Sequence, residues 1–95
     1  MLESALEKLF VREVKKLGGK AYKWVSPGNA GVPDRIVILP NRAPIFVELK
    51  TDSGRLTELQ KIQHRRLNKL GQNVVTLYGL KGVNNFLTEM EQELR

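Results

Sequence analysis

The stretch 31–50, GVPDRIVILPNRAPIFVELK, holds two short runs rich in β-branched residues, 35–39 and 45–49, joined by the proline-flanked segment 40–44. Runs of this kind on either side of a tight connection are typical of a β-hairpin. Apolar residues occupy both faces of the first run, which is typical of a strand inside a covered sheet. We therefore expect this hairpin to form the centre of the fold.

Three charged residues gather at one end of this hairpin. The two-residue period of a strand places Glu48 and Lys50 on the same face, and an antiparallel partner brings Asp34, at the start of the neighbouring strand, close to Glu48. Charges at the end of a buried strand are costly to desolvate unless they pair or coordinate something. The three residues therefore form either a metal or substrate site or a structural Asp-Lys-Glu ion network.

A metal site has a clear chemical basis here. Adjacent carboxylates repel each other, and a hard cation such as Mg²⁺ offsets that repulsion while keeping several waters for chemistry. Lys50 is then placed to position or deprotonate a water, or to stabilise charge that develops on a phosphate. The chain has no cysteine and one histidine, which excludes thiolate and multi-histidine zinc sites within one chain. Any metal must therefore use oxygen ligands.

The chain has 95 residues, which we expect to form a single domain, 1–95, around one modest core. Its formal charge of +6 and pI of about 9.9 are expected of a nucleic-acid binder, although solvated surface charge gives the same composition. No apolar run approaches the roughly 20 residues of a membrane span, and the sequence does not begin with a signal-peptide pattern. We expect a cytoplasmic protein with no membrane partner.

Apolar residues at helical spacing predict amphipathic helices over 2–17 and 56–70, each followed by glycine. In the first helix, Glu3 and Glu7 share a face, and Ser4-x-x-Glu7 matches a capping box. In the second, Thr57-x-x-Gln60 matches a capping box as well. His64 is expected on the polar side, with no chemical role.

Two basic features are candidate DNA contacts. The predicted strand 20–25 leads into the loop 26–31, whose backbone amides, with Lys23 and Ser26, are placed to touch a phosphate, although an ordinary turn explains the loop equally well. Arg35, directly after Asp34, is assigned to the same surface. The second predicted helix carries a basic ridge at i, i+4 and i+8 that either tracks a DNA backbone or is simply a solvated face; the ridge consists of Lys61, Arg65 and Lys69.

The rest of the chain completes an α/β pattern. A strand is predicted over 73–78 and a terminal helix over 83–94, which gives the order α-β-β-β-α-β-α. A helix between the third and fourth strands makes that pair parallel through a right-handed crossover. We expect a mixed four-stranded sheet flanked by helices.

Taken together, these motifs resemble a known family. The ordered set of Lys23 to Gly28, Gly31-Val32-Pro33-Asp34, Glu48-Leu49-Lys50 and Gln60 is similar to the PD-(D/E)xK nuclease superfamily, and more narrowly to the small stand-alone VRR-NUC domains of phage and bacteria. The likeness covers nearly the whole chain and implies a restriction-endonuclease-like fold.

The resemblance also implies roles for individual residues. Asp34, Glu48 and the carbonyl oxygen of Leu49 would hold Mg²⁺ or Mn²⁺, Lys50 would serve the attacking water, and Gln60 would help to hold the lysine or the water. A glutamate of the first helix would complete the acidic cluster. Glu3 and Glu7 both remain candidates for that position.

The function expected on this basis is a metal-dependent endonuclease that hydrolyses DNA phosphodiesters without an organic cofactor. One small domain offers one site, whereas resolving a four-way (Holliday) junction needs two nicks in opposed strands, so we expect a symmetric homodimer acting on branched DNA. The runner-up is a monomeric nuclease that cuts flaps or nicks duplexes. The rival from another class is a non-catalytic DNA-binding module. If the protein is phage-encoded, it works in the cytoplasm of a bacterial host.

Overall fold

The order of helices and strands follows the sequence pattern. A computed structural model describes residues 1–95, and none of its helices combines the length and apolar character needed to cross a membrane. The elements are α1 (Glu3–Lys16), β1 (Lys20–Lys23), β2 (Arg35–Ile38), β3 (Ile45–Lys50), α2 (Glu58–Lys69), β4 (Asn73–Tyr78) and α3 (Gly79–Glu93). The predicted α-β-β-β-α-β-α order is confirmed.

The four strands form one mixed sheet in the order β1-β2-β3-β4. The first three are antiparallel neighbours, joined by the long loop 24–34 and the shorter connection 39–44. The pair β3 and β4 is parallel, since α2 carries the chain back to the starting edge. In the register, Arg35 is opposite Val47 and Lys50 is opposite Tyr78. This register sets the charged residues of β3 beside the start of β2 and the end of β4.

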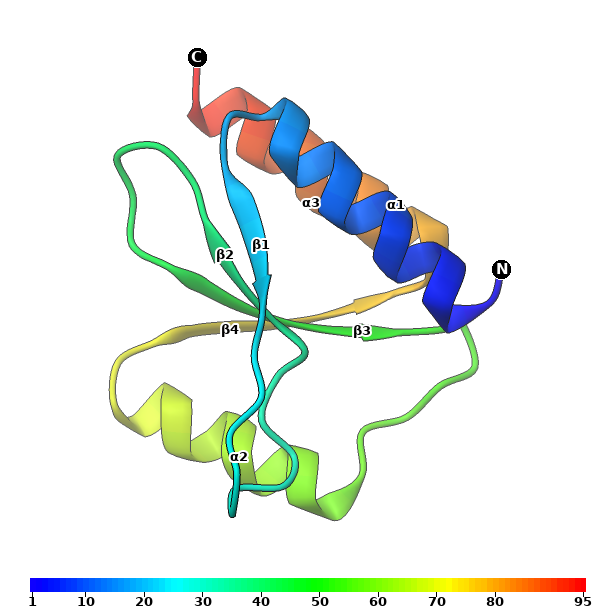
Figure 1. The fold of residues 1–95 in the computed structure, drawn as a ribbon, viewed down its shortest axis with the longest axis vertical. Coiled ribbons are helices and arrows are strands. Elements are labelled where there is room, and N and C mark those ends of the chain that lie inside the picture. Colours follow the sequence, from blue (N-terminus) through cyan, green and yellow to red (C-terminus); the bar gives the residue numbers. More distant parts are fainter.

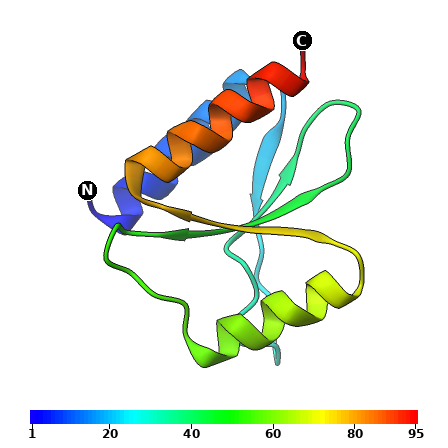
Figure 2. The same cartoon turned by 180° about the vertical axis from the view of Figure 1, so that it is seen from behind.

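The core lies between the sheet and the helices α1 and α3. Figures 1 and 2 show these two helices side by side on one face of the sheet, with α2 alone on the other. Phe10 of α1 and Phe86 of α3 meet with ring centroids 5.8 Å apart. The fully buried side chains around them come from both helices and from the sheet: Leu6, Val14, Val37, Ile45, Val47, Leu49 and Val83.

The other face of the sheet is covered only in part. Leu59 of α2 and its C-cap Leu70 are 54% and 73% exposed, and the buried residue of this helix is His64. The predicted apolar stripe is therefore buried only in part, at Ile62 and Leu67, which are half-buried. Ile38 of β2 is 39% exposed on this side, so the prediction that both faces of β2 are covered was wrong for its end. A single helix is too narrow to cover four strands.

Some element boundaries differ from the sequence prediction. Helix α1 begins at Glu3, with Leu2 as its N-cap, so Ser4 lies inside the first turn and the predicted capping box does not form. Strand β1 ends at Lys23, two residues early, although the Trp24 amide still donates to the Asp34 carbonyl at 3.0 Å. Helix α3 begins at Gly79 because that residue, with φ 63°, turns the chain directly out of β4.

Candidate active site

Glu48 is the centre of the candidate site. It lies in the middle of β3, and only 1% of its surface is exposed. Its Oε2 atom accepts a hydrogen bond from Gln60 Nε2 at 3.3 Å and lies 4.0 Å from Lys50 Nζ. Its Oε1 atom is buried without any hydrogen-bond partner. A buried carboxylate with a partnerless oxygen is costly, and such atoms call for a functional explanation.

Asp34 contacts β3 from the side of the neighbouring strand β2. It precedes β2 directly, and its Oδ2 atom accepts a hydrogen bond from the backbone amide of Leu49 at 3.0 Å. The loop before it is pinned to α2 at Gly31, which has φ 94° and where a Cβ would stand 2.5 Å from the Leu59 carbonyl. Only glycine fits that backbone and that approach. The structure thus brings Asp34, Glu48 and Lys50 together, as the hairpin pattern predicted.

The buried position of Glu48 and the nearby Asp34 carboxyl group change the pKa of Glu48. Burial is the main cause that raises the pKa of Glu48 from 4.5 to about 8, and the neighbouring Asp34 carboxyl group adds to the effect. The ammonium of Lys50 acts in the opposite direction and lowers it. Without a further cation nearby, Glu48 is therefore largely protonated at neutral pH.

Gln60 joins the site to the first turn of α2. Its amide nitrogen donates to Glu48, while its amide oxygen accepts from the Thr57 backbone N–H at 2.9 Å. The Gln60 backbone N–H in turn donates to Thr57 Oγ1 at 3.1 Å, which completes the predicted capping box. The predicted capping box is therefore confirmed, and the same side chain also reaches Glu48, not Lys50.

His64 belongs to this cluster, and its prediction as a surface residue was wrong. It is 7% exposed. Its Nε2 atom lies 3.8 Å from Glu48 Oε1 and has no hydrogen-bond partner. Burial lowers the pKa of His64, so the imidazole is held neutral more readily than in water. The available signal was spacing, because residue 64 follows Gln60 by four positions and shares its helix face.

The two glutamates of α1 have different surroundings. Glu7 forms an ion pair with Arg35, whose Nε atom donates to Glu7 Oε1 at 3.1 Å and whose Nη1 atom donates to the Ala21 carbonyl at 3.3 Å. Arg35 shares the sheet face of Val47, opposite that of Glu48, so the structure engages it inside the protein rather than leaving it open to DNA. Glu3 is exposed and close enough to Glu48 to help raise its pKa.

The remaining predicted DNA contacts lie on the surface. Lys23 is exposed at the end of β1, and Ser26 Oγ accepts a hydrogen bond from the Asn29 side chain at 3.0 Å within the loop. On α2, Lys61 pairs with Glu58 at 3.2 Å. The other two members of the basic ridge, Arg65 and Lys69, are exposed. None of these five side chains joins the buried cluster around Glu48.

The oxygen atoms near Glu48 set limits on what the site can hold. No group of three or more His, Asp or Glu side chains is clustered closely enough to enclose a metal ion. Two carboxylates and a backbone carbonyl nevertheless suit a hard cation of the Mg²⁺ type, which is commonly bound through one or two carboxylates and keeps several waters. The partnerless Glu48 Oε1 is the atom that such a cation would satisfy.

Comparison with known proteins finds similarity both in sequence and in structure. "Putative nuclease p44" of Acyrthosiphon pisum secondary endosymbiont phage 1 is 52% identical over 75 residues, which cover 79% of this chain and 81% of that protein. A solved structure described as a VRR_NUC domain has a TM-score of 0.84 and 31% identity, over 90% of this chain and 94% of that one. No family model matches the sequence. On the strength of these two similarities, this chain belongs to the VRR-NUC family of nucleases, within the PD-(D/E)xK superfamily.

Proposed function

We propose that the protein is a metal-dependent DNA endonuclease whose Mg²⁺ or Mn²⁺ is held by the Asp34 and Glu48 carboxylates and the Leu49 carbonyl oxygen. The observation that carries the proposal is the buried Glu48 carboxyl group, whose Oε1 atom receives no hydrogen bond and which lies beside a second acid, Asp34, that raises its pKa. A site of this kind costs free energy in the isolated protein. That cost is explained if the carboxylates serve a ligand of opposite charge.

The side chains around the carboxylates have different roles in the proposed hydrolysis. When bound, the cation supplies Lewis acidity and lowers the pKa of a coordinated water. Lys50 offers an ammonium at the edge of the site, where it orients the attacking water and stabilises the charge that develops on the phosphate oxygens. Gln60 fixes the orientation of Glu48 through the 3.3 Å hydrogen bond. His64, with its Nε2 3.8 Å from Glu48 Oε1, restricts the carboxylate from the other side.

Glu3 is the better candidate for the additional acid of the first helix. Its charge reaches Glu48, whereas Glu7 is paired with Arg35 on the opposite face of the sheet. Glu3→Gln is therefore expected to slow cleavage while Glu7→Gln weakens the fold. Single-turnover cleavage rates and thermal melting of the two variants test this assignment, and equal loss of rate would contradict it.

DNA is bound through the basic surface. The formal charge of +6 favours a polyanion, and the ridge of Lys61, Arg65 and Lys69 stands on the helix that also supplies Gln60. Lys23 and the loop of Ser26 extend this surface along the approach to Asp34. Because such contacts go to phosphates, we expect little preference for base sequence.

The substrate we propose is branched DNA, with a four-way junction preferred, and the working form is a symmetric homodimer. Resolution of a junction requires two opposed nicks, which two equivalent sites related by a two-fold axis supply. With the phage relative as support, we place the protein in the cytoplasm of a bacterial host. Sedimentation tests the dimer, and paired, symmetry-related cuts on a synthetic junction test the substrate. A monomer at micromolar concentration that prefers linear duplex would refute this part alone.

Nicking of supercoiled plasmid with Mg²⁺, or with EDTA in its place, tests the catalytic part of the proposal. We expect cleavage only with the metal, and a loss of at least 100-fold in Asp34→Asn and Lys50→Ala, the scale of losing one electrostatic contact to the transition state. Glu89→Gln, which removes an exposed carboxylate on α3, is the matched control and retains the rate. Metal-dependent cleavage that survives Asp34→Asn would show that the site is elsewhere, and DNA binding without any cleavage would favour the non-catalytic module.

A further inference from the structure

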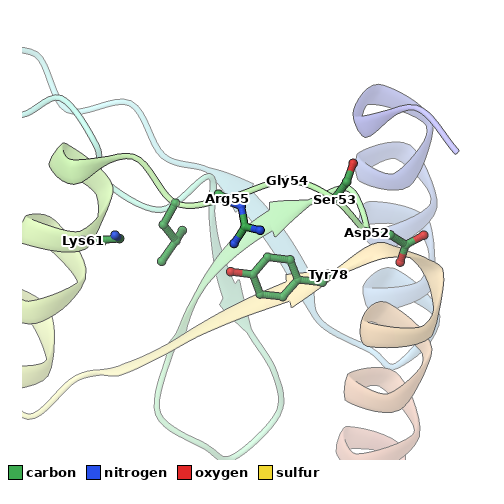
Figure 3. A pocket seen from close by; sticks show the side chains of 7 residues that line it. Asp52, Ser53, Gly54, Arg55, Lys61 and Tyr78 are labelled. Atoms are coloured by element: carbon green, nitrogen blue, oxygen red, sulfur yellow. The ribbon is translucent and has the colours of Figure 1, made fainter.

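A second pocket adjoins the candidate active site and has no role so far. It has a volume of about 390 Å³ and lies among the loop after β3, the end of β4 and the start of α2. Figure 3 shows Lys61 at the α2 end of this pocket, Asp52 at the α3 end, and Arg55 and Tyr78 between them. Its volume is within the range of small-ligand sites.

The pocket and the active site share a wall. Gly54 lines the pocket, and a Cβ at Gly54 would stand 3.2 Å from the Cβ atom of Lys50, so the loop backbone packs directly on the lysine. Tyr78 is the neighbour of Lys50 in the parallel register of β3 and β4. The pocket therefore lies directly beside Lys50 on the same face of the sheet.

The charges of the pocket suit a phosphate. Arg55 is exposed, and none of the chain's salt bridges includes it. Lys61 pairs only with Glu58, whose side chain is 82% exposed, and a surface pair of this kind is easily exchanged for a phosphate. Two cations are thus available on the same pocket.

Asp52 is the one acidic residue that lines the pocket, and it lies at the α3 end, away from Lys61. The Asp52 carboxylate packs on Gly79, where a Cβ would lie 1.9 Å from its Oδ1 atom. Gly79 is the first residue of α3, and the start of a helix favours a negative charge. Asp52 therefore packs against the start of α3, at the end of the pocket away from Lys61.

Tyr78 offers the pocket an aromatic surface. It is 42% exposed, although it ends a strand that is paired along its length. Aromatic side chains beside a basic groove bind nucleic-acid strands by stacking on bases or sugars, without regard to sequence. A tyrosine beside Arg55, with Lys61 farther along the same pocket, therefore offers a base-binding surface next to a phosphate-binding one.

We propose that this pocket binds the nucleotide adjacent to the scissile phosphate, with its phosphate between Arg55 and Lys61 and its base or sugar against Tyr78. The inference rests on the proposed nuclease function and names a subsite of the same substrate. Arg55 and Tyr78 position the strand across Lys50. They take no part in bond breaking.

The test separates binding from cleavage. Binding is measured in the Glu48→Gln background by fluorescence anisotropy of a labelled four-way junction at several salt concentrations. Arg55→Ala is expected to weaken binding roughly 5- to 10-fold and to lower the salt slope by about one. Tyr78→Ala weakens it about 10-fold, on the scale of one lost stack, whereas Tyr78→Phe keeps the ring and stays within about two-fold. Arg95→Ala removes the same charge at the far end of α3 and is the control.

Cleavage by the otherwise unmodified protein gives the second readout. Arg55→Ala is expected to raise KM with kcat retained, as for a contact made equally in the ground and transition states. Affinity and salt slope equal to those of Arg95→Ala would overturn the subsite, even if metal-dependent cleavage is intact. Arg55-dependent binding by a protein that never cleaves DNA would instead refute the nuclease proposal and support nucleotide binding in this pocket. Absence of any DNA binding would refute both.

Discussion

Replacing Glu48 by glutamine should stabilise the metal-free protein at alkaline pH. The folded-state pKa of Glu48 is raised to about 8, above its ordinary value of 4.5, mainly by burial. The folded protein therefore keeps a proton that the unfolded chain releases, and the free energy of unfolding falls as the pH rises from about 4.5 to about 8. One pKa unit corresponds to about 1.4 kcal/mol, so the loss reaches up to about 5 kcal/mol. Glutamine resembles the protonated side chain and removes this loss.

Thermal and urea denaturation in EDTA, followed by circular dichroism from pH 4.5 to 9, measure the effect. The two proteins should be similar near pH 4.5, and the variant should melt more than roughly 10 °C above the unmodified protein at pH 8.5. Mg²⁺ should then stabilise the unmodified protein at pH 8.5 and leave Glu48→Gln unchanged, because the ion needs the ionised carboxylate. A stability difference that does not vary with pH, or one that favours the unmodified protein as pH rises, would refute the reasoning.

Three further predictions concern α2 and its contacts. Gly31→Ala should destabilise the fold by more than about 2 kcal/mol, since it adds a backbone clash to a positive φ, whereas Gly28→Ala, with φ 80° and open space around it, should cost roughly 1 kcal/mol; urea denaturation compares them. Gln60→Glu keeps the helix cap but loses the donor to Glu48, so metal-free stability should fall by about 1–3 kcal/mol at pH 8 and little at pH 4.5. Removing the basic ridge, Lys61, Arg65 and Lys69, should lower the salt slope of DNA binding by about one per lost contact, and an unchanged slope would mean that the ridge faces away from DNA.

The hairpin and its charged end could be predicted because their signals are local. The two-residue period of a strand is enough to put Glu48 and Lys50 on one face. The antiparallel register then brings Asp34 alongside without knowledge of the rest of the chain. The capping box of α2 is similarly local, and it formed as predicted.

The features that the sequence misjudged or left open depend on contacts between distant elements. His64 is buried because α2 lies across the face that carries Glu48, and no local pattern states which side of a polar helix meets the sheet. Glu7 could be assigned to Arg35 only when α1 and β2 were placed together. The pocket beside Lys50 brings the stretch 52–61 together with Tyr78, which is distant in the sequence. Local periodicity in the sequence predicts that an element exists, whereas tertiary packing decides which residues it contacts.

The side-chain amide of Gln60 makes one hydrogen bond to the cap of α2 and another to Glu48, so the candidate site is coupled to the order of the first turn of α2. A half-turn of this amide, harmless in a surface glutamine, would break the cap of α2 and the hydrogen bond to Glu48 at once. Helix ends open locally at low cost, so each fraying of the first turn of α2 also frees the carboxylate. Hydrogen exchange at the Gln60 backbone amide should therefore slow when Mg²⁺ binds. We therefore expect fraying of the first turn of α2 to weaken the proposed metal site.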